Sequence, residues 1–324
     1  MLDVRSILSI LASNIKATGL PVPAPREALY SWSEGLSIPK DGDTLLYTGG
    51  LYQLLPYIEV YSSQLAKLED KRSGGLLLRA AGRFSSLSRI AGAIVRPSKR
   101  EVEESKRILQ SIVRLLDAAG VRVAYRREVD GYSGVLLYDM GLDDDFKKHF
   151  AQVARSLAQT GARTIVTVDP HTTHVLRSVA RRLGLLPELE VKTYLELLAE
   201  NIDNINFKKG RAGTAAIHDS CLYARRENVI AQPRLLLERA GYQILEPRRS
   251  GRLTYCCGGP IESIAPKLSS RIALARIGEL ADTGAERIAT MCPICLANLK
   301  RASRTAGGPP VVDLSLLLAE RLEA

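Results

Sequence analysis

Short apolar runs alternate with longer stretches of helical periodicity along most of this chain. The runs are bounded by glycine, proline or aspartate and predict strands, which in the first half lie at residues 44–48, 121–125, 134–138 and 164–168. Helical spacing of apolar residues predicts helices at residues 51–68, 101–119, 144–160, 170–183 and 191–202. Strands that are apolar throughout and separated by helices are typical of a parallel sheet covered on both faces. The pattern therefore predicts an α/β fold.

Two stretches depart from this alternation. In the first, Ile7, Leu8, Leu11 and Ile15 recur at helical spacing and predict an amphipathic helix, which a proline-rich segment and a short helix follow. We interpret residues 1–43 as a leader and not as a domain. The second stretch, residues 71–100, is basic and rich in serine and glycine without a clear period. It is either a helical excursion or a mobile insertion.

The second half of the chain repeats the first. Four pairs of segments align, namely residues 46–52 with 217–223, 138–141 with 255–258, 162–172 with 285–295, and 197–200 with 317–320. This repeat predicts two tandem, pseudo-symmetric three-layer domains at residues 44–202 and 203–324, each with a mainly parallel sheet flanked by helices. The same register places a tail helix at residues 312–322.

Composition is that of an ordinary globular protein, with 46% hydrophobic and 25% charged residues among 324. No apolar run approaches the ~20 residues that a membrane helix needs, and no signal peptide is evident. An odd number of cysteines, five, argues against a disulfide framework and predicts a cytoplasmic protein, at most peripheral to a membrane-bound complex.

The net charge of +10 suits an anionic substrate or an acidic partner. Nucleic acid is disfavoured, because the basic residues are scattered and aromatic residues make up only 5% of the chain. Four arginines close to the cysteines either line a surface for an acidic partner or form a solvated face; they are Arg225, Arg226, Arg248 and Arg249.

The cysteines stand in the order C-x34-CC-x34-C-x2-C, at Cys221, Cys256, Cys257, Cys292 and Cys295. Neighbouring cysteines rarely bond to each other, because the disulfide would strain the peptide between them. Five thiols from three places, with none elsewhere, predict one metal site. Side chains of adjacent residues in an extended segment point to opposite faces, which suits a cluster of several metal ions better than one tetrahedral ion. Zinc needs only four of the five thiolates and stays the alternative.

The residues around the cysteines suit bound thiolates. Cys292 followed by Pro293 predicts a helix N-cap with proline in the first position, so that the positive end of the helix faces the sulfurs. Gly258 and Gly259 allow a sharp turn that exposes backbone N–H groups to sulfur. His218, shortly before the first cysteine, either tunes or ligates the metal or, more simply, makes an ordinary hydrogen bond at a strand end.

The first half lacks this motif. In the repeat register the five cysteines face Gly50, Asp139, Met140, Asp169 and Thr172. Asp169 with His171 and His174 is a conceivable metal set, but Asp169 as the cap of the following helix is the simpler explanation. We expect Met140 to pack in the core.

The cysteine order, with Gly258 after the pair and Pro293 inside the C-x2-C, resembles the cysteine-rich CCG domain. That domain occurs in tandem in the B and D subunits of heterodisulfide reductase and in the iron-sulfur subunits of glycolate and glycerol-3-phosphate oxidases. The resemblance covers nearly the whole chain. It implies a noncubane [4Fe-4S] cluster, or zinc as in some members, held by Cys221, Cys256, Cys257, Cys292 and Cys295.

The resemblance also implies a role. Residues 14–26 and 32–42 resemble the segment that joins a ferredoxin domain to the first repeat in fused members, which implies a separate ferredoxin-like or flavin-containing partner in a hetero-oligomer. The expected function is an iron-sulfur oxidoreductase subunit that transfers electrons to a thiol/disulfide or organic acid couple. A non-catalytic scaffold with structural zinc is the alternative. A two-cluster reaction does not follow, because the first repeat lacks the cysteines, and no catalytic residue is assigned.

Overall fold

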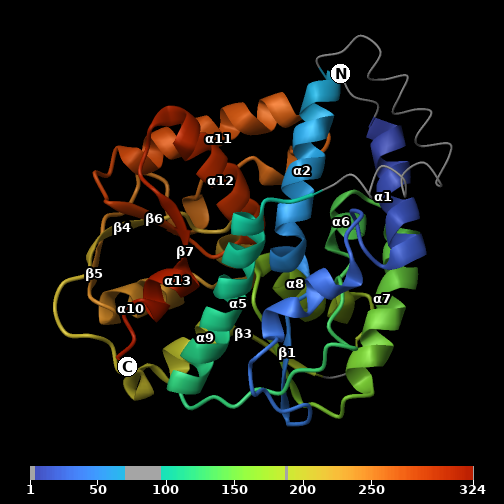
Figure 1. Cartoon of the computed structure of the whole chain (residues 1–324), viewed down its shortest axis with the longest axis horizontal. Coiled ribbons are helices and arrows are strands. Elements are labelled where there is room, and N and C mark those ends of the chain that lie inside the picture. Colours follow the sequence, from blue (N-terminus) through green and yellow to red (C-terminus); the bar gives the residue numbers. More distant parts are fainter. Residues whose placement is uncertain (1–3, 70–95, 187–188, 324) are drawn as a thin grey trace.

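A computed structural model describes residues 4–69, 96–186 and 189–323 (Figure 1). Most of the basic stretch at residues 71–100 lies outside these residues, so both interpretations of it stay predictions. No helix in the described part of the chain is both long and apolar enough to span a membrane.

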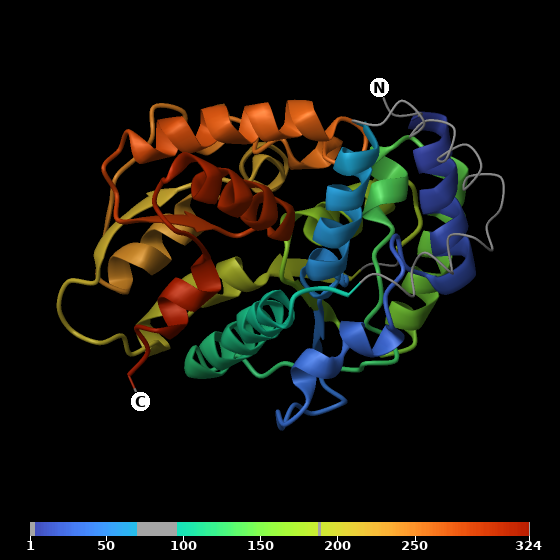
Figure 2. The same ribbon diagram turned by 45° about the horizontal axis from the view of Figure 1, so that its top comes forward.

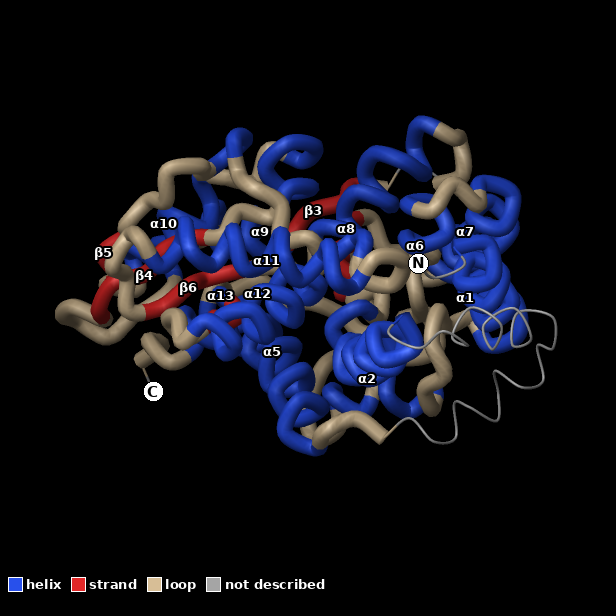
Figure 3. Tube along the Cα trace, turned by 90° about the horizontal axis from the view of Figure 1, so that it is seen from above, coloured by secondary structure: helices blue, strands red, loops and turns tan. Residues whose placement is uncertain are grey.

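Two parallel sheets lie in the two halves of the chain. The first has the order β1-β2-β3, with β1 Thr44–Tyr47, β2 Thr164–Thr167 and β3 Glu190–Thr193. The second has the order β5-β4-β6-β7, with β4 Gly213–Ile217, β5 Tyr242–Ile244, β6 Arg287–Thr290 and β7 Val311–Asp313. Helices flank both sheets, as Figure 3 shows from above. The predicted α/β class with parallel sheets is confirmed.

The two sheets share one strand order. Ala124, inside the predicted strand at residues 121–125, makes an isolated parallel bridge to Leu45 of β1. The amide N–H of Leu46 donates to the Ala124 carbonyl at 2.8 Å, and that of Ala124 donates to the Thr44 carbonyl at 2.8 Å. This short extended segment therefore lies beside β1 as β5 lies beside β4. The common order supports the internal repeat, while the domain limits at residues 43 and 202 stay a prediction.

The helices fill the connections between strands. Their bounds are α1 Val4–Thr18, α2 Leu51–Glu69, α5 Lys99–Ala118, α6 Val135–Asp139, α7 Asp143–Ala158, α8 Pro170–His174, α9 Tyr194–Glu200, α10 Ala231–Arg239, α11 Pro266–Ala281, α12 Pro293–Ala306 and α13 Leu314–Ala319. Two π-helical segments, Val175–Ala180 and Tyr223–Glu227, continue from the first turns of helices that follow β2 and β4. The predicted helices at residues 51–68, 101–119 and 144–160 are confirmed within two residues.

Three predicted elements are wrong. The apolar run at residues 134–138 is the helix α6 and not a strand, because Gly134, at φ 84°, turns the chain into a helical turn. The helices predicted at residues 191–202 and 312–322 each begin with a strand, β3 and β7. Thr193 and Asp313 mark the change, since each side chain accepts a backbone N–H bond and caps the helix that follows. Apolar residues continue across these caps, so periodicity alone did not separate the two elements.

The larger of the two apolar cores joins both halves. It contains Trp32 and the buried face of α5 from the first half together with β4, β6 and α13 from the second. In Figure 2, α5 lies beside α13. The hydroxyl of Tyr52 also donates to Asp313 Oδ2 at 2.6 Å across this core. The two halves are therefore packed as one body around a shared apolar interior.

A buried carboxyl in the first half predicts a pH dependence of stability. Asp130 accepts hydrogen bonds from Thr48 N at 2.8 Å, Thr48 Oγ1 at 2.7 Å and Tyr125 Oη at 3.0 Å. Burial nevertheless raises the pKa of Asp130 from 3.8 to about 6. Between these values the folded state holds a proton that the unfolded chain has lost, so this carboxyl lowers the free energy of unfolding as pH rises from 4 to 6.

We expect Asp130→Asn to flatten that decline, since the amide does not titrate. Urea denaturation at a series of pH values from 4 to 6.5 measures it. Asp144→Asn, an exposed residue in the first turn of α7, is the matched control and should keep the wild-type slope. An unchanged slope in Asp130→Asn would contradict the assignment.

Candidate metal centre

The five cysteines meet at one edge of the second sheet. Cys221 follows the end of β4, and Cys292 follows the end of β6, its neighbour in the sheet. The carboxyl ends of adjacent parallel strands form the crevice in which α/β proteins bind ligands. Cys256 and Cys257 enter this crevice from the loop after Leu253, and Cys295 lies in the first turn of α12.

The five thiols form one continuous group of free cysteines. Cys256 interacts with Cys221 and Cys257, whereas Cys295 interacts with Cys257 and Cys292. Hydrogen bonds from Cys221 and Cys257 lower the pKa of Cys256 to about 2, and its donor Cys221 has a raised pKa. The vicinal pair thus points into the same space. The two side chains do not point to opposite faces as in an extended segment, because the chain turns immediately after the pair.

Glycine makes that turn possible. Gly258 has φ 80°, and a Cβ on it would lie 2.6 Å from the Ser269 carbonyl oxygen. A Cβ on Gly259 would lie 2.3 Å from Ile294 Cγ2 and 3.3 Å from the Cys257 sulfur. The amide N–H groups of Gly258 and Gly259 donate to the sulfurs of Cys256 and Cys257 at 3.3 and 3.4 Å, as predicted. Any larger residue at either position would push the backbone away from the sulfurs.

The N-terminus of α12 completes the site. Cys292 is its N-cap residue and Pro293 its first residue, as predicted, and the Cys292 side chain makes no cap hydrogen bond. The Cys292 sulfur is therefore free to face the other thiols while the positive end of the helix lies behind it. Asn298, one turn later, donates to the Cys257 carbonyl at 2.6 Å and fixes the vicinal pair against α12.

Asp169 has the same place in the first half, where it caps α8. Its Oδ1 accepts from the amide N–H groups of His171 at 2.8 Å and Thr172 at 3.0 Å, which confirms the cap interpretation. The imidazole rings of the two histidines lie near other carboxylates. His171 Nδ1 lies 3.6 Å from Asp139 Oδ2, and His174 Nδ1 lies 2.6 Å from Glu227 Oε1. Among the described residues, these side chains form no group with metal-ligand spacing.

The first half nevertheless reaches the cysteine site, because His171 hydrogen-bonds to Cys292 as well as to Asp139. Burial acts to lower the pKa of His171, but these two bonds outweigh it and raise the pKa. A pocket lined by Leu51, Asp139, His171, Gly259 and Ile294 opens beside this contact. Sequence reasoning missed the contact between His171 and Cys292. The available signal was a histidine directly after Asp-Pro at the position of the degenerate C-x2-C.

Met140, the counterpart of Cys257, is half-buried and lines a groove with α1 and not the core, so the packing expected for it is wrong.

Of the arginines near the site, Arg249 pairs with Glu279 at 3.0 Å and lies 3.9 Å from the Tyr255 ring centre. Arg225 Nε donates to the Arg252 carbonyl at 3.0 Å. These two side chains therefore brace the loop that carries the vicinal cysteines.

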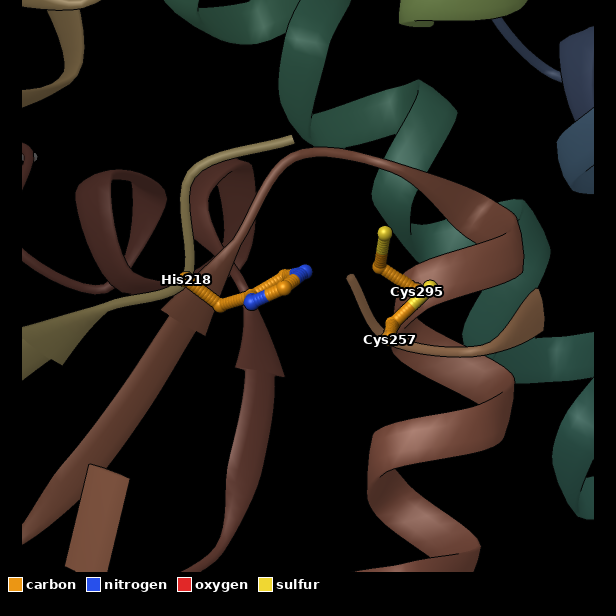
Figure 4. A group of neighbouring side chains, drawn as sticks. All are labelled: His218, Cys257 and Cys295. Carbon is orange, nitrogen blue, oxygen red and sulfur yellow. The ribbon is translucent and has the colours of Figure 1, made fainter. Parts of the chain in front are cut away.

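His218 completes the group from the β4 side. A ligand atom of its ring and the sulfurs of Cys257 and Cys295 all lie within 4.8 Å of one another, and Figure 4 shows the ring directed toward the two sulfurs. Arg276 Nε donates to His218 Nδ1 at 3.1 Å, and both side chains are buried. Burial first, and then the Arg276 charge, lower the pKa of His218 to about 3.

Comparison with known proteins agrees with the geometry. Residues 215–300 match the family model of the cysteine-rich CCG domain, and this range includes all five cysteines. A probable membrane-anchored ferredoxin of Chromohalobacter salexigens is 28% identical over 231 residues, covering 68% of this chain and 34% of its relative. The probable iron-sulfur-binding oxidoreductase FadF of Bacillus subtilis is 28% identical over 200 residues, covering 60% of this chain and 28% of the relative.

A third relative is the D subunit of the dihydromethanophenazine:CoB–CoM heterodisulfide reductase of Methanosarcina barkeri. It is 26% identical over 219 residues, covering 64% of this chain and 54% of the relative. The chain thus spans between 28% and 54% of the length of these three proteins. The resemblance predicted from the cysteine order is confirmed. The segment that holds the cysteine site matches the CCG cysteine-rich domain, and the chain is similar to an iron-sulfur-binding oxidoreductase and to the D subunit of heterodisulfide reductase.

Proposed function

We propose that this chain is an electron-transferring iron-sulfur subunit of a heterodisulfide reductase-like oxidoreductase. Cys221, Cys256, Cys257, Cys292 and Cys295 would hold one cluster, of the noncubane [4Fe-4S] type by resemblance. When bound, the cluster supplies a one-electron redox centre. The observation that carries this proposal is the continuous contact of five thiols from three segments.

The donor set fits such a cluster. Five thiolates exceed the four ligands of a tetrahedral zinc ion and suit several irons. The cluster would add negative charge, and the site offers the N-terminus of α12 together with the amide donors of Gly258 and Gly259. The chain itself holds the sulfurs in place and keeps water from the three buried ones, Cys257, Cys292 and Cys295.

Access differs between the two sides of the site. Cys221 and Cys256 are half-buried, so electrons can enter or leave there. On the other side, the pocket at Asp139 and His171 is open to a small substrate, of the thiol/disulfide or organic acid class. With no cysteines in the first half, the proposal involves one cluster and no two-cluster cleavage. We also propose a hetero-oligomer with a ferredoxin-like or flavin-containing subunit, since the relatives include a ferredoxin and a reductase subunit.

Iron and acid-labile sulfide assays on anaerobically purified protein test the proposal. We expect about four irons and four sulfides per chain. Electron paramagnetic resonance of the oxidised protein should then give a cluster signal that changes when a thiol is added. Colourless protein with one zinc ion and no sulfide would contradict the proposal and favour the alternative, a scaffold subunit with structural zinc.

A further inference from the structure

His218 lies against the cysteines, and its hydrogen bond to Arg276 determines which of its ring nitrogens carries the proton. A guanidinium group has only N–H donors and stays protonated in proteins. Because Arg276 Nε donates to Nδ1 of His218 at 3.1 Å, that nitrogen must offer its lone pair. The neutral ring then carries its proton on Nε2. Neither nitrogen has a lone pair left for a metal ion.

Burial and further hydrogen bonds keep the Arg276 side chain in the position from which it donates to His218. The Arg276 side chain is fully buried, and its Nη1 donates to the Arg249 carbonyl at 3.0 Å and to Glu279 Oε2 at 2.9 Å. Moving the imidazole proton to Nδ1 would set two donors against each other between two buried side chains. The Arg276 side chain therefore fixes the tautomer of His218.

We propose that His218 is not a metal ligand but a positioning residue whose Nε2–H donates to sulfur at the Cys257 and Cys295 end of the site. Its ring atom and these sulfurs lie within 4.8 Å of one another, with the ring directed at them (Figure 4). A hydrogen bond to a cluster sulfur stabilises the more negative, reduced state and raises the reduction potential. This tuning role rests on the proposed function, whereas the tautomer does not.

The variant His218→Asn separates the two roles. Its Oδ1 can still accept from Arg276, but its side chain is too short to donate to the sulfurs. We expect iron and sulfide contents equal to wild type and a more negative reduction potential in a titration followed by electron paramagnetic resonance. His149→Asn is the control, because His149 lies in the first half against the Tyr132 carbonyl; its potential should not move. Loss of iron, or an unchanged potential, in His218→Asn would overturn the proposal.

Wild-type protein labelled with ¹⁵N-histidine gives a second readout should the variant fail to fold. Because His171 also contacts Cys292, electron-nuclear double resonance is measured on labelled wild-type protein and on labelled His171→Asn. Both should show only weak ¹⁵N coupling to the cluster, whereas a strong ¹⁵N coupling that persists in His171→Asn would identify His218 as a ligand and refute the inference. If the protein carries no cluster, the proposed function fails on its own. Two-bond ¹H–¹⁵N correlation then still decides the tautomer: a proton on Nε2 of His218 upholds the inference, and one on Nδ1 overturns it.

Discussion

Replacing Cys257 by serine should abolish most of the iron and sulfide bound by the anaerobically purified protein. Cys257 is the middle of the thiol group, since it interacts with both Cys256 and Cys295. It is buried, and its carbonyl is fixed by Asn298. A serine hydroxyl is a poor ligand for iron and leaves the remaining four sulfurs split between two sides of the site. Iron, sulfide and the visible absorption of the purified variant measure the loss.

Met140→Ala is the matched control, because Met140 is the counterpart of Cys257 in the repeat register. Met140 lies in a groove beside α1, and no described contact joins it to the cysteines. Its replacement should leave iron and sulfide at wild-type levels. Equal loss of metal from both variants would contradict a single site in the second half and would indicate that both halves contribute to it.

The features of the site that the sequence could predict depend on local backbone preferences. The strand ends before Cys221 and Cys292, the cap at Cys292 and the amide donors at Gly258 and Gly259 all follow from backbone preferences within a few residues. Neighbouring parallel strands then bring these segments to one edge. The register of the repeat correctly put Asp169 at a helix cap like that of Cys292.

What sequence could not predict depends on contacts between distant residues. Arg276 is one basic residue among many in the chain, and nothing local distinguishes it from the exposed arginines. Only the tertiary packing of α11, which lies against α12, brings it to His218, 58 residues earlier. In the same way, Thr193 ends a strand because Val191 pairs with Ile165 of β2, a partner that periodicity does not reveal. Tertiary pairing therefore decided both the element types at residues 191–202 and the surroundings of His218.

Replacing the buried Arg276 side chain should strongly lower the free energy of unfolding. Arg276→Met would keep much of the side-chain volume but remove three hydrogen bonds. His218 Nδ1 and the Arg249 carbonyl would lose their partner, and Glu279 would keep only Arg249. Each acceptor left without its donor in the interior costs about 1–3 kcal/mol, so we expect the free energy of unfolding to fall by several kcal/mol. Urea denaturation of anaerobically purified protein, followed by circular dichroism, measures the change.

Arg287→Met is the control for the loss of an arginine in general. Arg287 pairs with Glu320, but their side chains are 39% and 46% exposed, so water can replace the contact. Exposed pairs of this kind contribute about 0–1 kcal/mol. A difference between the two variants would therefore measure burial and not charge. If Arg276→Met unfolded at the same urea concentration as Arg287→Met, the buried hydrogen bonds of Arg276 would contribute no more to stability than an exposed ion pair, which would contradict the firm support that we assign to Arg276.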